Sequence, residues 1–140
     1  MSFRKFEDVK LICLNIWKFR QGAAVTLPGL GIITGNAASF DQGLLKHEFG
    51  HILQYRQCGF FFYWFRIAPV SFLSARRAGK EIHYNHMHCW TEWTANLISF
   101  HYFNSPEDWD HQHYPIKPSG SRISNPPHFM LKRTVVQLLN

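Results

Sequence analysis

The segment from His47 to His51, with the sequence H-E-F-G-H, limits the fold of this 140-residue chain more than any other feature. Two histidines four positions apart lie side by side only when the segment between them is helical, because a strand would hold them about 13 Å apart. We expect this helix to run from about Asp41 to Gln57 and to end at Gly59, a residue type common after the last helical turn. Ser39 and Gln42 match the capping box that begins many helices.

A pair of histidines at this spacing can bind one zinc ion, and the adjacent Glu48 can then take a proton from a water molecule on that ion. Catalytic zinc sites usually have three protein ligands and one open position, so His47 and His51 need a third partner. The metzincin pattern places a glycine three residues, and a histidine six residues, after the second histidine. Gln54 and Gln57 occupy these positions, which excludes that pattern.

Three segments before this helix have the composition of strands. Val9 to Trp17 mixes β-branched and apolar residues with alternation. Ala23 to Leu27 and Gly31 to Thr34 flank a turn signal at Pro28 to Leu30. We therefore expect a small antiparallel sheet of about three strands ahead of the helix.

The second half of the chain contains one further clear helix. A stripe of apolar residues predicts it from about Met87–Trp90 to Phe103. Between Gly59 and Gly79 we expect a loop and helical pieces, because Pro69 forbids one uninterrupted helix. Residues 104–127 are predicted to be irregular, and residues 129–139 to form a short helix or a strand.

The two predicted helices together resemble a minimal gluzincin metallopeptidase, similar to the catalytic cores of integral-membrane zinc peptidases and to the compact minigluzincins. Gluzincins carry a pattern close to N-E-x-x-A-D on a downstream helix, and residues 91–96 here are T-E-W-T-A-N. The matching part runs from about Gly22 to Phe103. The resemblance implies an α+β, zincin-like fold, and the length of the chain favours a single domain over residues 1–140. Its small antiparallel sheet would pack on the active-site helix and on the glutamate-bearing helix.

The resemblance also implies a chemistry. One zinc ion would be held by His47, His51 and Glu92, and would lower the pKa of its water toward about 7. Glu48 would take the proton as general base and pass it to the leaving amine of a peptide or protein substrate. Asn96 stands where gluzincins usually have an aspartate that orients a zinc-bound histidine. An asparagine can accept the same hydrogen bond but carries no charge.

Two more features of the site follow from the resemblance. An extended substrate would add to the edge of the small sheet, and the strand from Gly31 to Gly35 is expected to be that edge. A histidine or tyrosine would stabilise the oxyanion, and His88, one turn before Glu92, is the preferred candidate. The other candidates are His86, His101, Tyr102 and Tyr114.

Composition and charge limit the partners of the chain. Its net charge is +6, but Lys and Arg are dispersed and no nucleic-acid-binding module accompanies them, so we expect no nucleic-acid partner. Met1 to Arg20 lacks the apolar region of a signal peptide, and no apolar run reaches the roughly 20 residues of a membrane-spanning helix, which favours a cytoplasmic protein. The aromatic run from Phe60 to Phe65 either belongs to the core or forms a patch that contacts another protein or a membrane interface, without spanning the membrane.

Other assignments stay open from the residues alone. A second group of ligand-type residues precedes Glu92, namely His83, His86, His88 and Cys89. This group could bind a metal of its own, or provide His88 in place of Glu92. The scaffold could also serve as a non-catalytic zinc-binding or interaction module. An intact Glu48 favours the enzyme, because a purely structural zinc site has no use for a general base.

Overall fold

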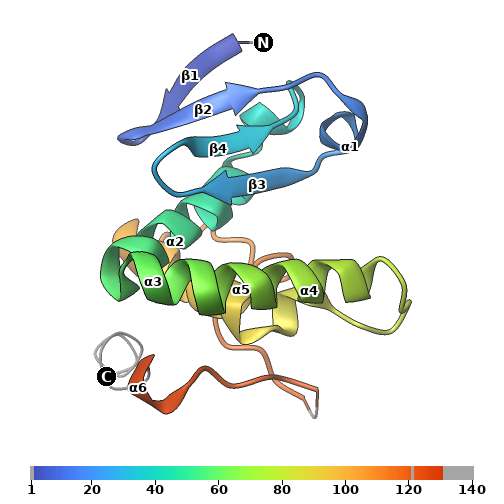
Figure 1. The fold of residues 1–140 in the computed structure, drawn as a ribbon, viewed down its shortest axis with the longest axis vertical. Helices are drawn as coiled ribbons and strands as arrows, with labels where there is room; N and C mark the ends of the chain where they lie inside the picture. The colour runs from blue at the N-terminus through green and yellow to red at the C-terminus, as the bar shows by residue number, and fades with distance from the viewer. Residues whose placement is uncertain (1, 121, 131–140) are drawn as a thin grey trace.

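The computed structural model describes residues 2–120 and 122–130 and shows a mixed α+β fold, with a sheet at one end of the molecule and helices below it (Figure 1). The sheet has four strands in the order β1-β2-β4-β3. The strands are β1 (Ser2–Phe6), β2 (Val9–Cys13), β3 (Ala24–Leu27) and β4 (Gly31–Thr34). The α+β prediction with a small sheet is confirmed, and the prediction of about three antiparallel strands is wrong in number and in direction.

The error in strand direction has a clear cause. β2 ends at Cys13 rather than at Trp17, and a short helix, α1 (Trp17–Arg20), follows it. This helix and β3 form a crossover that returns the chain beside β2, so β2 and β4 pair in parallel. The predicted hairpin between β3 and β4 is confirmed, and they pair antiparallel around Pro28 to Leu30.

The strand order also corrects the expected substrate edge. Ile33 of β4 pairs with Ile12 of β2 on one side and with Val25 of β3 on the other. The strand from Gly31 to Thr34 therefore lies inside the sheet, and the prediction that it forms the edge is wrong. The edges are β1 and β3, because the chain returns past β3 to insert β4 next to β2.

The predicted central helix is confirmed as α2 (Gln42–Cys58). Its N-cap is Asp41, whose carboxylate accepts a hydrogen bond from the Leu44 N–H at 3.0 Å. The predicted capping role of Ser39 is wrong, since its hydroxyl donates instead to the Asn36 carbonyl at 2.6 Å, in the 3-10 turn η1 (Ala38–Phe40). Gly59 ends the helix as predicted, with a φ of 83° that other residues rarely adopt.

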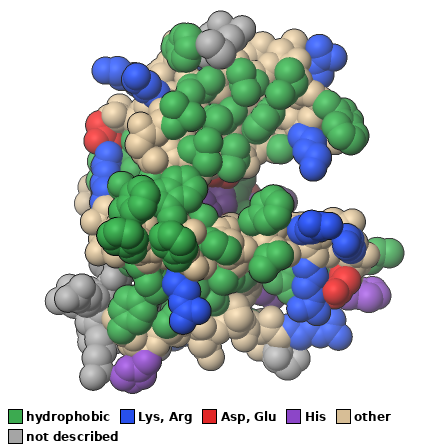
Figure 2. Space-filling model, viewed as in Figure 1, with side chains coloured by type: hydrophobic (Ala, Val, Ile, Leu, Met, Phe, Trp, Pro, Cys, Tyr) green, Lys and Arg blue, Asp and Glu red, His purple; other side chains and the backbone are tan. Residues whose placement is uncertain are grey.

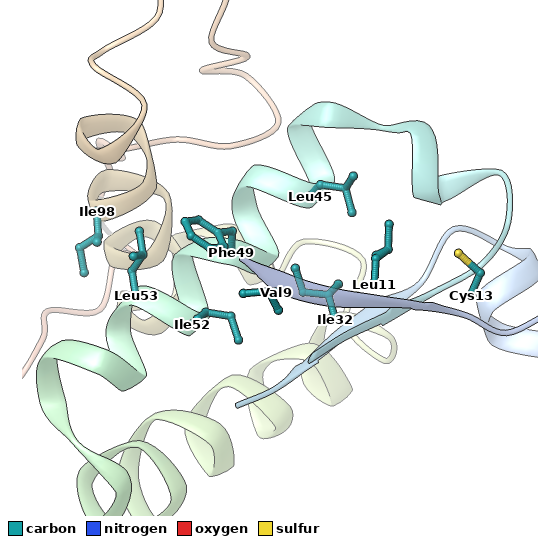
Figure 3. Packing of buried hydrophobic residues seen from close by; sticks show 9 residues of the cluster. All are labelled: Val9, Leu11, Cys13, Ile32, Leu45, Phe49, Ile52, Leu53 and Ile98. Atoms are coloured by element: carbon teal, nitrogen blue, oxygen red, sulfur yellow. The ribbon is translucent and has the colours of Figure 1, made fainter. Parts of the chain in front are cut away.

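One face of α2 packs against the inner face of the sheet and forms the main hydrophobic core (Figure 3). Phe49 and Ile32 are fully buried at its centre, where α2 meets β4. This packing fixes α2 against the sheet and leaves its other faces for the rest of the molecule. The cluster consists of Val9, Leu11, Cys13, Ile32, Leu45, Phe49, Ile52, Leu53 and Ile98.

The segment expected to contain a loop is helical without a break (Figure 1). It comprises α3 (Phe60–Phe62), the π-helical turn η2 (Tyr63–Ile67) and α4 (Ala68–Ala78). Pro69 lies in the first turn of α4, directly after the π turn, where its missing N–H and its ring are tolerated. The expectation of a loop is therefore wrong.

The second predicted helix is confirmed as α5 (Trp90–Tyr102), preceded by the 3-10 turn η3 (His86–His88). The irregular segment after α5 returns across it, and the Ser124 hydroxyl and carbonyl accept hydrogen bonds from the Trp90 N–H at 2.8 Å and the Trp93 indole at 3.1 Å. The chain then forms α6 (His128–Met130), and the rest of the predicted segment 129–139 lies outside the described residues. No helix among residues 2–120 and 122–130 combines the length and the apolar character that crossing a bilayer demands.

Candidate metal centre

Three imidazole rings converge on one carboxylate oxygen where α2 crosses α5. The Nε2 atoms of His47 and His51 lie 3.3 and 3.2 Å from Oε2 of Glu92. His86, from η3, places its Nε2 3.3 Å from the same oxygen. Glu92 is 1% exposed, and both histidines of α2 are also buried. The predicted ligands His47, His51 and Glu92 are therefore brought together from two helices.

The spacing within this cluster fits a metal ion. Zinc bonds of about 2.0–2.1 Å in a tetrahedral arrangement put neighbouring ligand atoms about 3.3 Å apart. The two distances from Glu92 to the α2 histidines match that value. Among the described residues, His47, His51 and Glu92 form one group whose ligand atoms all lie within 4.8 Å of one another. The donor set of two imidazoles and one carboxylate is compatible with a metal ion, and the group does not by itself identify the metal.

Asn96 fixes the orientation of His47. Its Oδ1 lies 2.7 Å from Nδ1 of His47, while its amide nitrogen donates to the Pro115 carbonyl at 3.0 Å. Because a carbonyl only accepts, this second bond sets which end of the amide faces the ring. Nδ1–H of His47 then donates to Asn96, and Nε2 is the ring nitrogen left to bind a metal ion. Asn96, which was predicted to orient a zinc-bound histidine, thus contacts one of the two predicted histidine ligands.

Gln54 does the same for His51. Its Oε1 lies 2.8 Å from Nδ1 of His51, and its amide nitrogen donates to the Thr91 carbonyl at 2.7 Å and to the Thr94 hydroxyl at 2.8 Å. Gln54 is completely buried and joins α2 to α5. Sequence reasoning used Gln54 only to exclude another pattern. The sequence did contain a signal for the role of Gln54. An amide lies one helical turn after the predicted ligand His51 and directly follows the apolar pair Ile52 and Leu53.

A glycine lets the two helices approach closely enough for this contact. A Cβ atom at Gly50, between the two histidines, would overlap the carbonyl group of Ala95 on α5. Ala95 is itself completely buried. The small side chain of Ala95 on α5 and the lack of a side chain at Gly50 on α2 together permit this close contact.

Glu48 lies on the side of α2 that faces the sheet edge. The Thr26 hydroxyl on β3 lies 2.7 Å from Oε2 of Glu48 and 2.9 Å from its backbone carbonyl. Glu48 is 6% exposed, so its carboxylate is held in place rather than free in solvent. The surface is hollowed between the sheet and the helices below it, and histidine and acidic side chains are visible in the hollow (Figure 2).

The electrostatics of the cluster favour a charged carboxylate at Glu92. Burial alone would raise its pKa, but the charge of His51 and the hydrogen bonds from His47, His51 and His86 hold the pKa well below its usual range. Burial lowers the pKa of His51, and the charge and hydrogen bond of Glu92 outweigh it and raise the pKa to about 9. A cation bound at Nε2 therefore competes with a proton at His51.

Two tyrosines flank the centre. Tyr63 of the π turn is 3% exposed, and burial, followed by the charges of Glu48 and Glu92, raises its pKa. The ring of Tyr114 lies 5.6 Å from that of His47 at an angle of 31°. Burial, followed by nearby carboxylates, raises the pKa of Tyr114 to about 12. Both hydroxyls therefore stay protonated across the physiological range.

Three of the other oxyanion candidates lie away from Glu92. His88 lines a separate cavity of about 230 Å³ together with His83 and Arg122. His101 packs on Phe100, and the Tyr102 hydroxyl donates to Glu7. His86 is the candidate whose ring approaches Glu92, although the sequence favoured His88.

The second group of ligand-type residues divides between different surroundings. His86 contacts Glu92, His83 and His88 line the separate cavity, and the buried Cys89 accepts a hydrogen bond from the Thr91 hydroxyl at 3.4 Å. Within the described chain, these residues do not form a metal-binding group of their own. Comparison of the chain with protein-family models, with curated proteins and with solved structures finds no match.

Proposed function

We propose that the protein is a zinc-dependent peptidase of the gluzincin type, with a zincin-like fold. The observation that carries the proposal is the convergence of the Nε2 atoms of His47 and His51 on Oε2 of Glu92, at the spacing of a tetrahedral zinc site. Each imidazole also donates its Nδ1–H to an amide oxygen, the arrangement typical of metal-binding histidines. A simple ion pair between Glu92 and the two histidines would require neither the spacing of a tetrahedral site nor an amide acceptor for each imidazole.

Each group at the site has a distinct role in the proposed hydrolysis. Zinc supplies a polarised water and a Lewis acid for the substrate carbonyl. Glu48, next to the first ligand, takes the proton of the water and delivers it to the leaving amine. The Thr26 hydroxyl holds the carboxylate of Glu48 through a 2.7 Å hydrogen bond, so the base points in one direction before the substrate arrives.

The position of Thr26 also suggests where a substrate binds. β3 (Ala24–Leu27) is an edge strand, and its residue Thr26 contacts the general base directly. An extended peptide can pair with the free edge of such a strand and bring one of its peptide bonds to the base and the ligands. We assign the substrate edge to β3, in place of the interior strand that the sequence indicated.

His86 is the best-placed group to stabilise the oxyanion. Its Nδ1 lies 2.8 Å from the Ser74 hydroxyl, which lies 2.7 Å from the Tyr84 hydroxyl. These contacts anchor the ring to α4 while Nε2 points toward Glu92. A donor held in advance near the developing charge is the arrangement that lowers the barrier of such reactions most.

The same histidine supports a second candidate function. If Nε2 of His86 becomes a fourth ligand, the site is closed, as in structural zinc sites that only stabilise a fold or an interaction module. Replacement of His86 by alanine separates the two functions. A peptidase retains zinc and loses turnover, whereas a closed structural site loses zinc affinity.

The enzyme proposal is tested with a denatured, fluorescently labelled protein as substrate and with zinc-loaded wild type beside Glu48→Gln. We expect the wild type to cleave it, and the variant to be slower by about 10²–10⁴-fold with unchanged zinc content. Glu107→Gln, a change at an exposed carboxylate, serves as the matched control and should retain full activity. Equal rates for wild type and Glu48→Gln would contradict the proposal.

A further inference from the structure

Exposed aromatic side chains line the outer side of the continuous helix from α3 to α4. Phe61, Phe65 and Phe72 recur at nearly helical spacing and are 76%, 70% and 65% exposed. The rings of Phe61 and Phe65 stack at 6.4 Å. The aromatic run from Phe60 to Phe65 is therefore divided. Tyr63 enters the core and Phe62 and Trp64 pack partly against it, while Phe60, Phe61 and Phe65 face solvent.

The outer face of the sheet is apolar as well. Phe3, Ile12, Ile33 and Val25 are directly paired across the strands in the order β1-β2-β4-β3, and form one row. They alternate with the residues that pack on α2, so the row lies on the side of the sheet away from the core. Its ends, Phe3 and Val25, are 63% and 40% exposed, and Ile12 between them is 8% exposed. Trp17, on the crossover, is 74% exposed. Hydrophobic side chains over the sheet and over α3 and α4 appear together on one face (Figure 2).

Basic side chains predominate around this face. Residues 9–40 contain three Lys or Arg and no Asp or Glu, and residues 60–80 contain four Lys or Arg and no Asp or Glu. Arg66 and Arg76 are exposed beside the phenylalanines. Lys and Arg side chains border both apolar areas, and acidic side chains appear only at the margins and within the hollow (Figure 2).

We propose that this face, formed by the outer row of the sheet and the exposed side of α3 to α4, docks onto an anionic lipid surface. Apolar rings and cations side by side give the two signals that stable interfacial binding needs, because rings enter the headgroup boundary and cations pair with acidic lipids. A second copy of the chain is disfavoured as occupant, since a symmetric contact would press the cations of both faces together. The inference does not depend on the proposed peptidase activity.

The test is cosedimentation of the full chain with vesicles of phosphatidylcholine alone and of phosphatidylcholine mixed with phosphatidylglycerol. We expect binding to the anionic vesicles, weaker in high salt, and about tenfold or greater loss in the double variant Phe61→Ser/Phe65→Ser. Phe40→Ser is the matched control, because Phe40 is 65% exposed but contacts Arg4, whose side chain lies on the other side of the sheet. It should bind like the wild type.

The charge is tested with Arg66→Glu/Arg76→Glu, which should bind anionic vesicles at least as weakly as the aromatic variant. Circular dichroism of each variant verifies folding. The proposal would be overturned if the wild type did not bind anionic vesicles, or if the aromatic variant bound them as well as the wild type does. A wild-type dimer that the aromatic substitutions convert to a monomer, without vesicle binding, would assign the face to a second copy instead.

Discussion

Two regions of the molecule depart from the usual division between interior and surface, in opposite directions. Where α2 crosses α5, the interior holds ionisable and amide side chains, with Gln54 and Asn96 completely buried and Glu92 1% exposed. Along α3 to α4 the surface carries phenylalanines such as Phe61, which is 76% exposed. The polar interior costs desolvation, and the apolar surface costs contact with water.

The two regions differ in how fully their side chains are paired within the fold. Within the described chain, no buried side-chain nitrogen or oxygen lacks a hydrogen-bond partner, so the polar interior is fully paired and rigid. Apolar residues of similar volume would often stabilise such a crossing as well or better. The exposed rings contact one another, as Phe61 and Phe65 do, but keep most of their surface in water. We therefore attribute both regions to the binding proposed for them rather than to the stability of the fold.

The largest effect is expected where the two helices touch. Gly50→Ala forces a methyl group against the Ala95 carbonyl, so the free energy of unfolding should fall by about 3 kcal/mol and Glu92 should move away from the histidines. Urea denaturation and zinc titration measure the two effects. Gly79→Ala is the control, since its φ of −70° suits alanine and the added Cβ would make only ordinary van der Waals contacts. Equal stability of both variants would show that the crossing is not tightly packed.

A smaller loss is expected from the amide network. Gln54→Met leaves the Thr91 carbonyl and Nδ1 of His51 without their partner, which should cost about 2 kcal/mol of unfolding free energy and about 10–100-fold in zinc affinity. The same substitution at the exposed Gln57 is the matched control and should change neither quantity. Unchanged zinc affinity in Gln54→Met would show that Gln54 does not contribute to zinc binding.

The stability of the metal-free protein should depend on pH through the same cluster. The pKa of His51 is raised from 6.5 to about 9 by Glu92, so its stabilisation is complete below pH 6.5 and is lost as the pH rises through 9. The pKa of Glu92 is lowered, so its stabilisation is present above pH 4.5 and is lost on acidification. Unfolding in urea with a chelator should therefore give a maximum between about pH 4.5 and 6.5. A steady rise in stability from pH 6 to 9 would contradict this coupling.

The exposed region should show the smallest effect on folding. Phe61→Ser removes a ring that is mostly in solvent, and should change the free energy of unfolding by about 0.5 kcal/mol or less. The buried aromatic of the same helix gives the contrast, since Tyr63→Ser should cost several times more. Thermal unfolding of the two variants compares them directly. Similar losses would show that the phenylalanines belong to the fold.

The sequence predicted the parts of the fold that depend on local patterns. The spacing of His47 and His51 predicted α2 to within about one residue at each end, because helical periodicity and the glycine at position 59 are local signals. The parallel pairing of β2 with β4 and the edge position of β3 depend on contacts between distant segments, which no local pattern records. Pro69 was misleading, because a π turn just before it absorbs the irregularity.

The candidate site shows the same division. His47, His51 and Glu92 were identified from motifs, and the structure brings them together. The motifs did not identify Gln54 and did not select His86 over His88. The orientation of side chains within a short turn and the hydrogen bonds between helices depend on tertiary packing, which a motif does not record. His86 and His88 are two residues apart in η3, and only the fold decides that His86 faces Glu92.

The metal centre is tested most directly by the zinc stoichiometry and coordination of the purified protein, with Glu92→Gln beside it. We expect one equivalent of zinc with two imidazole nitrogens and one carboxylate oxygen at about 2.0–2.1 Å by X-ray absorption, and an affinity about 100-fold or more weaker in Glu92→Gln. Glu81→Gln, an exposed carboxylate paired with Arg77, should bind zinc like the wild type. Zinc bound equally well by Glu92→Gln, or no zinc in the wild type, would contradict the proposed metal centre.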